Sequence, residues 1–224
     1  MVGHLDFVRQ LKRFGIVTQC GHTMGTYEDG VAALMAGVSG FTHLFNAMTP
    51  LEHRQPGMVG AALAHARYAE LIPDLLHVHP GAIRAALRAI PHLYCVTDST
   101  AATGMPDGQY QLGSHTVHKC MGGVRLADGT LAGSTLTMDQ ALRNLVDIGV
   151  DLDDAARRLS TYPADYIGEF DRGRLAEGAC ADLAVFTHDL KLKAVYVEGE
   201  RIDLMDACGS AGGRRVCGLP GQRR

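Results

Sequence analysis

Two stretches of the sequence share one pattern: GIVTQCGHT at residues 15–23 and GFTHLFNAM at residues 40–48. Each is a short apolar run that starts at a glycine and ends close to a histidine, His22 in the first and His43 in the second. Short apolar runs bounded by turn residues predict buried strands. We therefore expect both histidines to lie where a strand ends.

The same pattern returns twice further along the chain. AELIPDLLHV at residues 69–78 predicts a strand with His77 at its end, and HLYCVTD at residues 92–98 predicts a strand that ends at Asp98. Four predicted strands thus each present a polar side chain near their carboxyl end.

Helical patterns separate these strands. Apolar residues recur every third position from Leu5 to Phe14, Thr26 is placed to cap a helix over residues 27–37, and Pro80 opens a helix over residues 81–90. Strands that alternate with helices predict an α/β fold with a parallel sheet. In parallel (β/α) barrels the chemistry lies at the carboxyl ends of the strands, so the four polar groups are expected to converge.

The remaining sequence predicts three further parts. Alternating residues split by glycines predict a hairpin inserted at about residues 108–133, and two helical patterns follow at residues 137–149 and 151–160. Residues 171–205 predict a small β unit, and the glycine- and arginine-rich residues 206–224 predict a disordered tail. The expected domains are therefore residues 1–170, residues 171–205 and the tail.

Composition narrows the class of protein and its partners. The 224 residues carry 21 basic and 24 acidic side chains, a net charge of −3, without a basic stripe in the body of the chain. Nucleic acid and membrane surfaces are poor candidate partners, and a small molecule is the better one. The six cysteines are scattered with no CxxC pair, and the first residues lack a secretory pattern, so we expect a cytoplasmic protein.

The strand-end residues have the chemistry of a hydrolytic metal site. Such a site needs two or three imidazole or carboxylate ligands and an open position for water. Spacing alone leaves His22 and His43 as metal ligands or as structural histidines. Asp98 could equally cap the turn that follows its strand, and His77 could be a surface residue.

Six short motifs follow one another along the chain: GHT (residues 21–23), THLFNAM (42–48), HRQPG (53–57), DLLHVHP (74–80), VTDSTAATG (96–104) and LAGSTLTM (131–138). In this order they resemble the N-acetylglucosamine-6-phosphate deacetylases of the amidohydrolase superfamily. The resemblance covers residues 5 to 202. It implies a partial (β/α)8 TIM-type barrel with a small C-terminal β unit.

By this resemblance His22 and His43 match metal ligands, and Asp98 matches the catalytic acid/base. His77 is expected to contact the substrate and to help polarise the acetyl carbonyl. The metal would be zinc, iron, manganese or cobalt, which two imidazoles do not distinguish.

The substrate implied by the resemblance is an amino-sugar phosphate. Arg54, with Asn46 and Ala47, is expected to hold the phosphate, and a guanidinium suits this role because its donors form a fixed fork. Three residues are expected to line the pocket near the acetyl group: Leu131, Ala132 and Gly133.

The sequence departs from the family pattern in two respects. Family members carry an upstream segment with a glutamate ligand in an EGP-like motif, which this sequence does not contain, so we expect a C-terminal portion of such an enzyme. Leu75 stands where the family favours glycine, and its Cβ restricts the backbone there.

The resulting hypothesis is hydrolysis of N-acetylglucosamine 6-phosphate to glucosamine 6-phosphate and acetate, by a chain that could form a homodimer. Two alternatives stay open at this point. One is another amidohydrolase, either dihydroorotase-like or an amino-acid deacetylase. The other is a truncated, non-catalytic module that binds sugar phosphates.

Overall fold

The computed structural model describes residues 4–120 and 122–203, so the predicted tail at residues 206–224 lies outside the described residues. The chain divides into two compact units, Met1–Ala179 and Cys180–Arg224. The first unit contains the α/β sheet, and the second contains a small antiparallel sheet.

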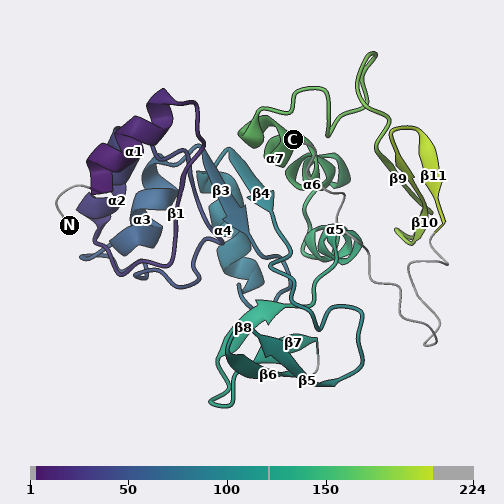
Figure 1. Ribbon diagram of the computed structural model, residues 1–224, viewed down its shortest axis with the longest axis horizontal. Helices are drawn as coiled ribbons and strands as arrows, with labels where there is room; N and C mark the ends of the chain where they lie inside the picture. Colours follow the sequence, from purple (N-terminus) through teal and green to yellow (C-terminus); the bar gives the residue numbers. More distant parts are fainter. Residues whose placement is uncertain (1–3, 121, 204–224) are drawn as a thin grey trace, which may run out of the picture. The chain divides into compact units, whose positions relative to one another are not determined.

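The first unit begins with alternating helices and strands, as the sequence predicts. These elements are α1 (His4–Arg13), β1 (Gln19–Cys20), α2 (Tyr27–Ala36), β2 (Gly40–Phe41), α3 (Gly57–His65), β3 (Tyr68–Leu71), α4 (Pro80–Ala89) and β4 (His92–Cys95). The four strands form one parallel sheet in the order β1-β2-β3-β4 (Figure 1). Strand order therefore follows chain order, as in a (β/α) barrel.

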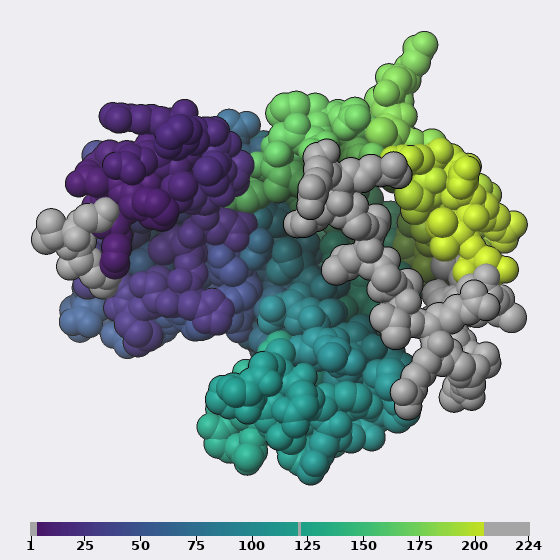
Figure 2. Space-filling model, in the orientation of Figure 1, coloured from purple at the N-terminus to yellow at the C-terminus, as the bar shows by residue number. Residues whose placement is uncertain are grey.

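The sheet is held together by a fully buried core. Phe41, Leu71 and Leu93, one on each of β2, β3 and β4, have no exposed surface. By contrast α1 buries none of its residues and lies at the surface, coloured purple in Figure 2. The strands β2, β3 and β4 thus contribute fully buried residues to the core, whereas both residues of β1 are only partly buried.

Two strands are shorter than the sequence predicts. β1 begins only at Gln19, because the N–H of Ile16 bonds to the carbonyl of Leu11 and so continues the end of α1. β3 ends at Leu71 instead of reaching residue 78, because Pro73 has no N–H to donate to a ladder. His77 therefore lies in a loop six residues beyond its strand.

Helix ends follow their local capping signals. Thr26 caps α2 in a capping box with Asp29, and Asp151 accepts N–H groups at the start of α6 (Leu152–Leu159). Pro80 opens α4, where the side chain of His79 accepts the N–H of Gly81.

Between β4 and the next helix the chain forms a four-stranded antiparallel sheet. Its strands are β5 (Gly108–Leu112), β6 (His115–Cys120), β7 (Gly123–Arg125) and β8 (Leu131–Ser134), in that order. A small apolar cluster of Ala102, Val117 and Val124 packs inside it. An isolated parallel bridge between Ser134 of β8 and Ser99 joins this sheet to the segment that follows β4.

Three helices complete the first unit: α5 (Met138–Asp147), α6 and α7 (Thr161–Ile167). Buried Arg158 of α6 donates to the carbonyl of Leu93 at 2.9 Å, which docks this helix on β4. The second unit contains β9 (Leu183–Phe186), β10 (Leu192–Val197) and β11 (Glu200–Ile202), with β10 in the centre. Among the described helices, none has the length and apolarity needed to cross a membrane.

Candidate active site

The candidate residues follow four neighbouring parallel strands at one edge of the sheet. His22 and His43 come two residues after β1 and β2, His77 lies in the loop after β3, and Asp98 comes three residues after β4. Because the strands are parallel, their carboxyl ends share one edge. This edge is where (β/α) barrels carry their chemistry.

The two histidines face each other. Their Nε2 atoms are 2.8 Å apart, and their rings meet edge to face with centroids 4.6 Å apart. His43 is 8% exposed. Both have positive φ angles, 47° for His22 and 25° for His43, which non-glycine residues adopt at a cost in free energy. Such strain collects at functional sites, so it adds weight to the pair.

The pair has the donor chemistry of a divalent-cation site, because two imidazole nitrogens face each other. With metal–nitrogen bonds of about 2.0–2.1 Å, tetrahedral ligands would lie about 3.3–3.4 Å apart and ligands at right angles about 2.9 Å apart. The observed 2.8 Å is a hydrogen-bond distance, so a tetrahedral cation would need the two rings to separate slightly. Within residues 4–120 and 122–203 there is no cluster of three or more His, Cys, Asp or Glu residues that could hold a metal. The described residues thus supply a pair of imidazole donors.

His77 forms a buried pair with Asp74, which sequence reasoning did not single out. Nδ1 of His77 is 2.6 Å from Oδ2 of Asp74, and both side chains are 6% exposed. Burial alone would raise the pKa of Asp74, but the hydrogen bonds it accepts from His77 and from the N–H of Leu76 outweigh burial and lower that pKa. Since Nδ1 is engaged by the carboxylate, Nε2 of His77 is left for another partner.

Leu75 follows Asp74 in this loop, at the position where the family pattern favours glycine. Leu75 has φ of 63°, in the left-handed region that glycine adopts without penalty. The turn is held because Oδ1 of Asp74 accepts the N–H groups of Leu76 and His77, both at 2.9 Å. The chain thus builds with leucine a turn that suits glycine.

The loop of Asp98 contacts the LAG segment of β8. The N–H of Ser134 donates to the carbonyl of Asp98 at 2.8 Å. A Cβ added to Gly133, where φ is 82°, would lie 2.7 Å from Cγ2 of Thr100 and 3.7 Å from Oδ2 of Asp98. Gly133 therefore lies directly against the candidate acid/base. Ala132 instead packs on the apolar cluster of the antiparallel sheet, and Leu131 of the same strand is partly buried.

The loop after β2 contains the residues predicted to hold a phosphate. The side chain of Asn46 donates to the carbonyls of His43 and Leu44, both at 3.2 Å, so it braces this loop. The carbonyl of Ala47 accepts the N–H of Thr23 at 3.0 Å, which ties the two histidine loops together. Neither contact was foreseen from the sequence.

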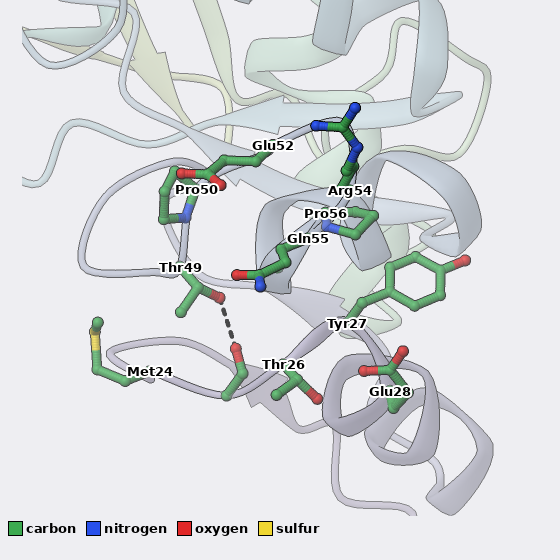
Figure 3. A pocket seen from close by; sticks show the side chains of 12 residues that line it. Met24, Thr26, Tyr27, Glu28, Thr49, Pro50, Glu52, Arg54, Gln55 and Pro56 are labelled. Carbon is green, nitrogen blue, oxygen red and sulfur yellow. Dashed lines mark hydrogen bonds between the residues drawn. The ribbon is translucent and has the colours of Figure 1, made fainter.

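Arg54 lines a cavity of about 460 Å³ between the start of α2 and residues 49–57. Figure 3 shows Arg54 and Glu52 on one loop, with Tyr27 and Glu28 contributed by α2. A hydrogen bond of 2.6 Å from Thr49 to the carbonyl of Gly25 joins the two walls (Figure 3). Among the described residues that line this cavity, Asn46 and Ala47 are absent. The structure therefore does not gather Arg54, Asn46 and Ala47, the three predicted phosphate ligands, around one cavity.

These features define a class of protein: a (β/α)-barrel type of α/β protein with a facing pair of imidazoles, and a carboxylate after β4, at the carboxyl edge of its parallel sheet. The comparisons with known proteins agree with that class and narrow it. The model of the amidohydrolase family matches residues 8–202, and the chain belongs to this family.

Relatives and solved structures confirm the resemblance seen in the six motifs. The N-acetylglucosamine-6-phosphate deacetylase of Vibrio furnissii is 38% identical over 219 residues, which are 96% of this chain and 54% of that protein. The N-acetylgalactosamine-6-phosphate deacetylase of Escherichia coli O157:H7 is 39% identical over 202 residues, 88% of this chain and 54% of that one.

A solved structure is similar over the same range. It is a variant of N-acetyl-D-glucosamine-6-phosphate deacetylase from Mycobacterium smegmatis in complex with N-acetyl-D-glucosamine-6-phosphate. It matches with a TM-score of 0.84 and 40% identity, covering 89% of this chain and 55% of that chain. The predicted α/β barrel class is thereby confirmed, and the chain spans about half the length of the relatives it matches.

Proposed function

We propose that this chain carries active-site residues of a metal-dependent deacetylase that converts N-acetylglucosamine 6-phosphate to glucosamine 6-phosphate and acetate. The observation that carries the proposal is the facing pair of imidazole nitrogens of His22 and His43, 2.8 Å apart at the carboxyl edge of a parallel sheet. The printed names of the relatives supply the substrate class.

His22 and His43 would hold a divalent cation, because their Nε2 atoms face each other. A divalent cation bound there supplies Lewis-acid activation of water and of the amide carbonyl. Zinc, iron, manganese and cobalt all suit imidazole ligands. The backbone at both His22 and His43 has a positive φ, and in this conformation the Nε2 atoms of the two rings face each other.

Asp98 carries the proton through the reaction. Its carboxylate takes the proton from the attacking water and then delivers a proton to the departing amine, so one group serves both half-steps. The N–H at Nδ1 of His77 donates to Asp74, which fixes the orientation of the ring. Nε2 of His77 donates to the acetyl oxygen when the ring carries both protons. The exposed position of Asp98 leaves it accessible to water and substrate.

The remaining residues bind and orient the sugar. Arg54 pairs with the phosphate through its fork of donors, near the loop that Asn46 and Ala47 form. Leu131, Ala132 and Gly133 are assigned to the border of the acetyl group, and the direct contact of Gly133 with the Asp98 loop supports this for Gly133. A small phosphorylated substrate and the free thiols of Cys20 and Cys95 support action in the cytoplasm.

The test is acetate release together with metal analysis, in this chain and in a version extended by its in-frame upstream sequence. With zinc, iron, manganese or cobalt supplied in turn, we expect one bound metal and release of acetate from N-acetylglucosamine 6-phosphate. N-acetylgalactosamine 6-phosphate, named for other relatives, is assayed beside it because the two sugars differ only at one hydroxyl.

Two outcomes would contradict the proposal. Bound metal without acetate from either sugar phosphate would remove the deacetylase assignment. Tight binding of the sugar phosphate that needs no metal and gives no turnover would instead indicate a binding module.

A further inference from the structure

Glu70 is a charged residue in the middle of β3, and its carboxylate is held from two sides. Oε1 accepts hydrogen bonds from Nε2 of Gln19 at 2.9 Å and from the hydroxyl of Tyr94 at 3.1 Å. Burial, and then the charge of Glu70, raise the pKa of Tyr94, so its hydroxyl stays protonated and keeps donating. The second oxygen, Oε2, is thereby directed toward β2.

That second oxygen accepts the main-chain N–H of His43 at 3.2 Å. The next N–H, of Leu44, donates to the main-chain carbonyl of Glu70 at 2.8 Å. The backbone at His43 has φ of 25°, a conformation that persists only where surrounding contacts determine it. Two consecutive hydrogen bonds to one residue supply such contacts.

The ring of His43 lacks the usual support. A metal-binding histidine commonly donates its second ring N–H to a carboxylate or carbonyl, which orients the ring. Nδ1 of His43 is buried and has no hydrogen-bond partner among the residues that the structure describes. The direction of its Nε2 therefore depends on where the main chain places the side chain.

The same network reaches the strand that leads to His22. Oε1 of Gln19, on β1, accepts the hydroxyl of Thr42 at 2.9 Å, and Thr42 directly precedes His43. The two strand ends also pack closely, because a Cβ added to Gly21 would lie 2.6 Å from Cβ of Thr42. Glu70 and Gln19 thus connect the main chains that carry both histidines.

We propose that Glu70 is a positioning residue for the His22–His43 pair, acting through the main chain of His43 instead of through a ring nitrogen. This proposal rests on the proposed function, because it takes His22 and His43 as the residues that bind a divalent cation. Glu70 itself touches neither substrate nor reacting atoms. Its role is to fix the separation and direction of the two Nε2 atoms.

Three variants of the full chain separate this role from a general loss of stability. Glu70→Leu removes both side-chain acceptors and keeps the main-chain carbonyl that accepts the N–H of Leu44. Glu70→Gln keeps a carbonyl for the N–H of His43. Its amide can donate to Gln19 and Tyr94 once the Gln19 amide reverses and the hydroxyls of Tyr94 and Thr42 turn to match. Ile83→Ala is the matched control, because Ile83 is fully buried on α4 and belongs to no part of the network.

The first measurement needs no metal. Backbone 13Cα and 13Cβ shifts of His43, with hydrogen exchange of its amide, report whether the backbone keeps its conformation. We expect Glu70→Leu to shift these signals and speed exchange, whereas Glu70→Gln and Ile83→Ala leave them near the native values. Unchanged signals in Glu70→Leu would overturn the proposal.

The second measurement is a Co²⁺ titration followed by visible absorption. We expect Glu70→Leu to weaken Co²⁺ binding about 10- to 100-fold, the range for losing an outer partner of a ligand, with an altered band shape. Glu70→Gln should restore the affinity and spectrum, and equal weakening in Ile83→Ala would overturn the proposal. If the unmodified chain binds no Co²⁺, the proposed function fails, while the metal-free shifts still decide the role of Glu70.

Discussion

Substituting Gly133 by alanine tests the contact between the LAG segment and the loop of Asp98. Two costs add in Gly133→Ala. An L-residue in the left-handed region, here at φ of 82°, loses about 1–2 kcal/mol relative to glycine. The new Cβ would also lie 2.7 Å from Cγ2 of Thr100 and 3.2 Å from the carbonyl oxygen of Asp98, and such overpacking costs about 1–3 kcal/mol.

Gly129→Ala is the matched control for this substitution. Gly129 has a similar φ of 88°, but a Cβ there meets nothing within 4 Å. Urea unfolding should therefore show a loss of about 1–2 kcal/mol for Gly129→Ala and about 2–5 kcal/mol for Gly133→Ala. Deacetylation should fall only in Gly133→Ala, because only there is Asp98 displaced.

A second substitution identifies the contact itself. Thr100→Ser removes the methyl group that the new Cβ meets and keeps the hydroxyl that contacts Ser134. In the Gly133→Ala background it should recover most of the stability difference between the two alanine variants. Equal losses in Gly133→Ala and Gly129→Ala, or no recovery with Thr100→Ser, would refute the reasoning.

Three further predictions concern the other loops of the site. Leu75→Gly removes the strain of a leucine in the left-handed region, and Leu76→Gly is its control because Leu76 has no positive φ. Urea unfolding should show the Leu75→Gly variant to be about 1–2 kcal/mol more stable than the Leu76→Gly variant. Equal stability of the two variants would contradict this. Asp74→Asn removes a carboxylate whose pKa is lowered in the folded chain. Its contribution to the free energy of unfolding is fully present above the ordinary pKa of 3.8 and is lost as the pH falls through the lowered pKa. The stability gap between native chain and Asp74→Asn, measured by urea unfolding across pH, should accordingly be constant near neutrality and shrink below pH 3.8, and a gap that widens in acid would be the wrong sign. Arg54→Ala should weaken binding of N-acetylglucosamine 6-phosphate by about 1.5–3 kcal/mol in calorimetry while leaving the unphosphorylated sugar unaffected, and exposed Arg88→Ala serves as the control in which neither should change.

Much of the α/β core could be predicted from the sequence because its signals are local. Thr26 and Asp151 cap the helices they precede, and Pro80 opens its helix, through contacts within a few residues. The apolar runs before His22 and His43 indicate strands on their own. Local patterns were less reliable at strand limits, as at Pro73, where one missing N–H stops β3.

The candidate site was predicted in part. His22, His43 and Asp98 were expected at strand ends and lie there, and the expectation of His77 at the end of a strand was wrong, since it lies in a loop. The buried partner of His77, Asp74, lies three residues away, a spacing that could have indicated it. Roles for these residues stay predictions until the assays above are made.

The sequence by itself determined the class of fold, the family and the order of polar groups along the strands, because periodicity, caps and motifs are written in neighbouring residues. Only the tertiary structure decided which of these groups meet. The 2.8 Å approach of His22 to His43, the bond from His43 to Glu70 and the contact of Gly133 with the Asp98 loop join residues 21 or more positions apart. Such contacts depend on strand register and backbone angles, which arise when the sheet packs as a whole.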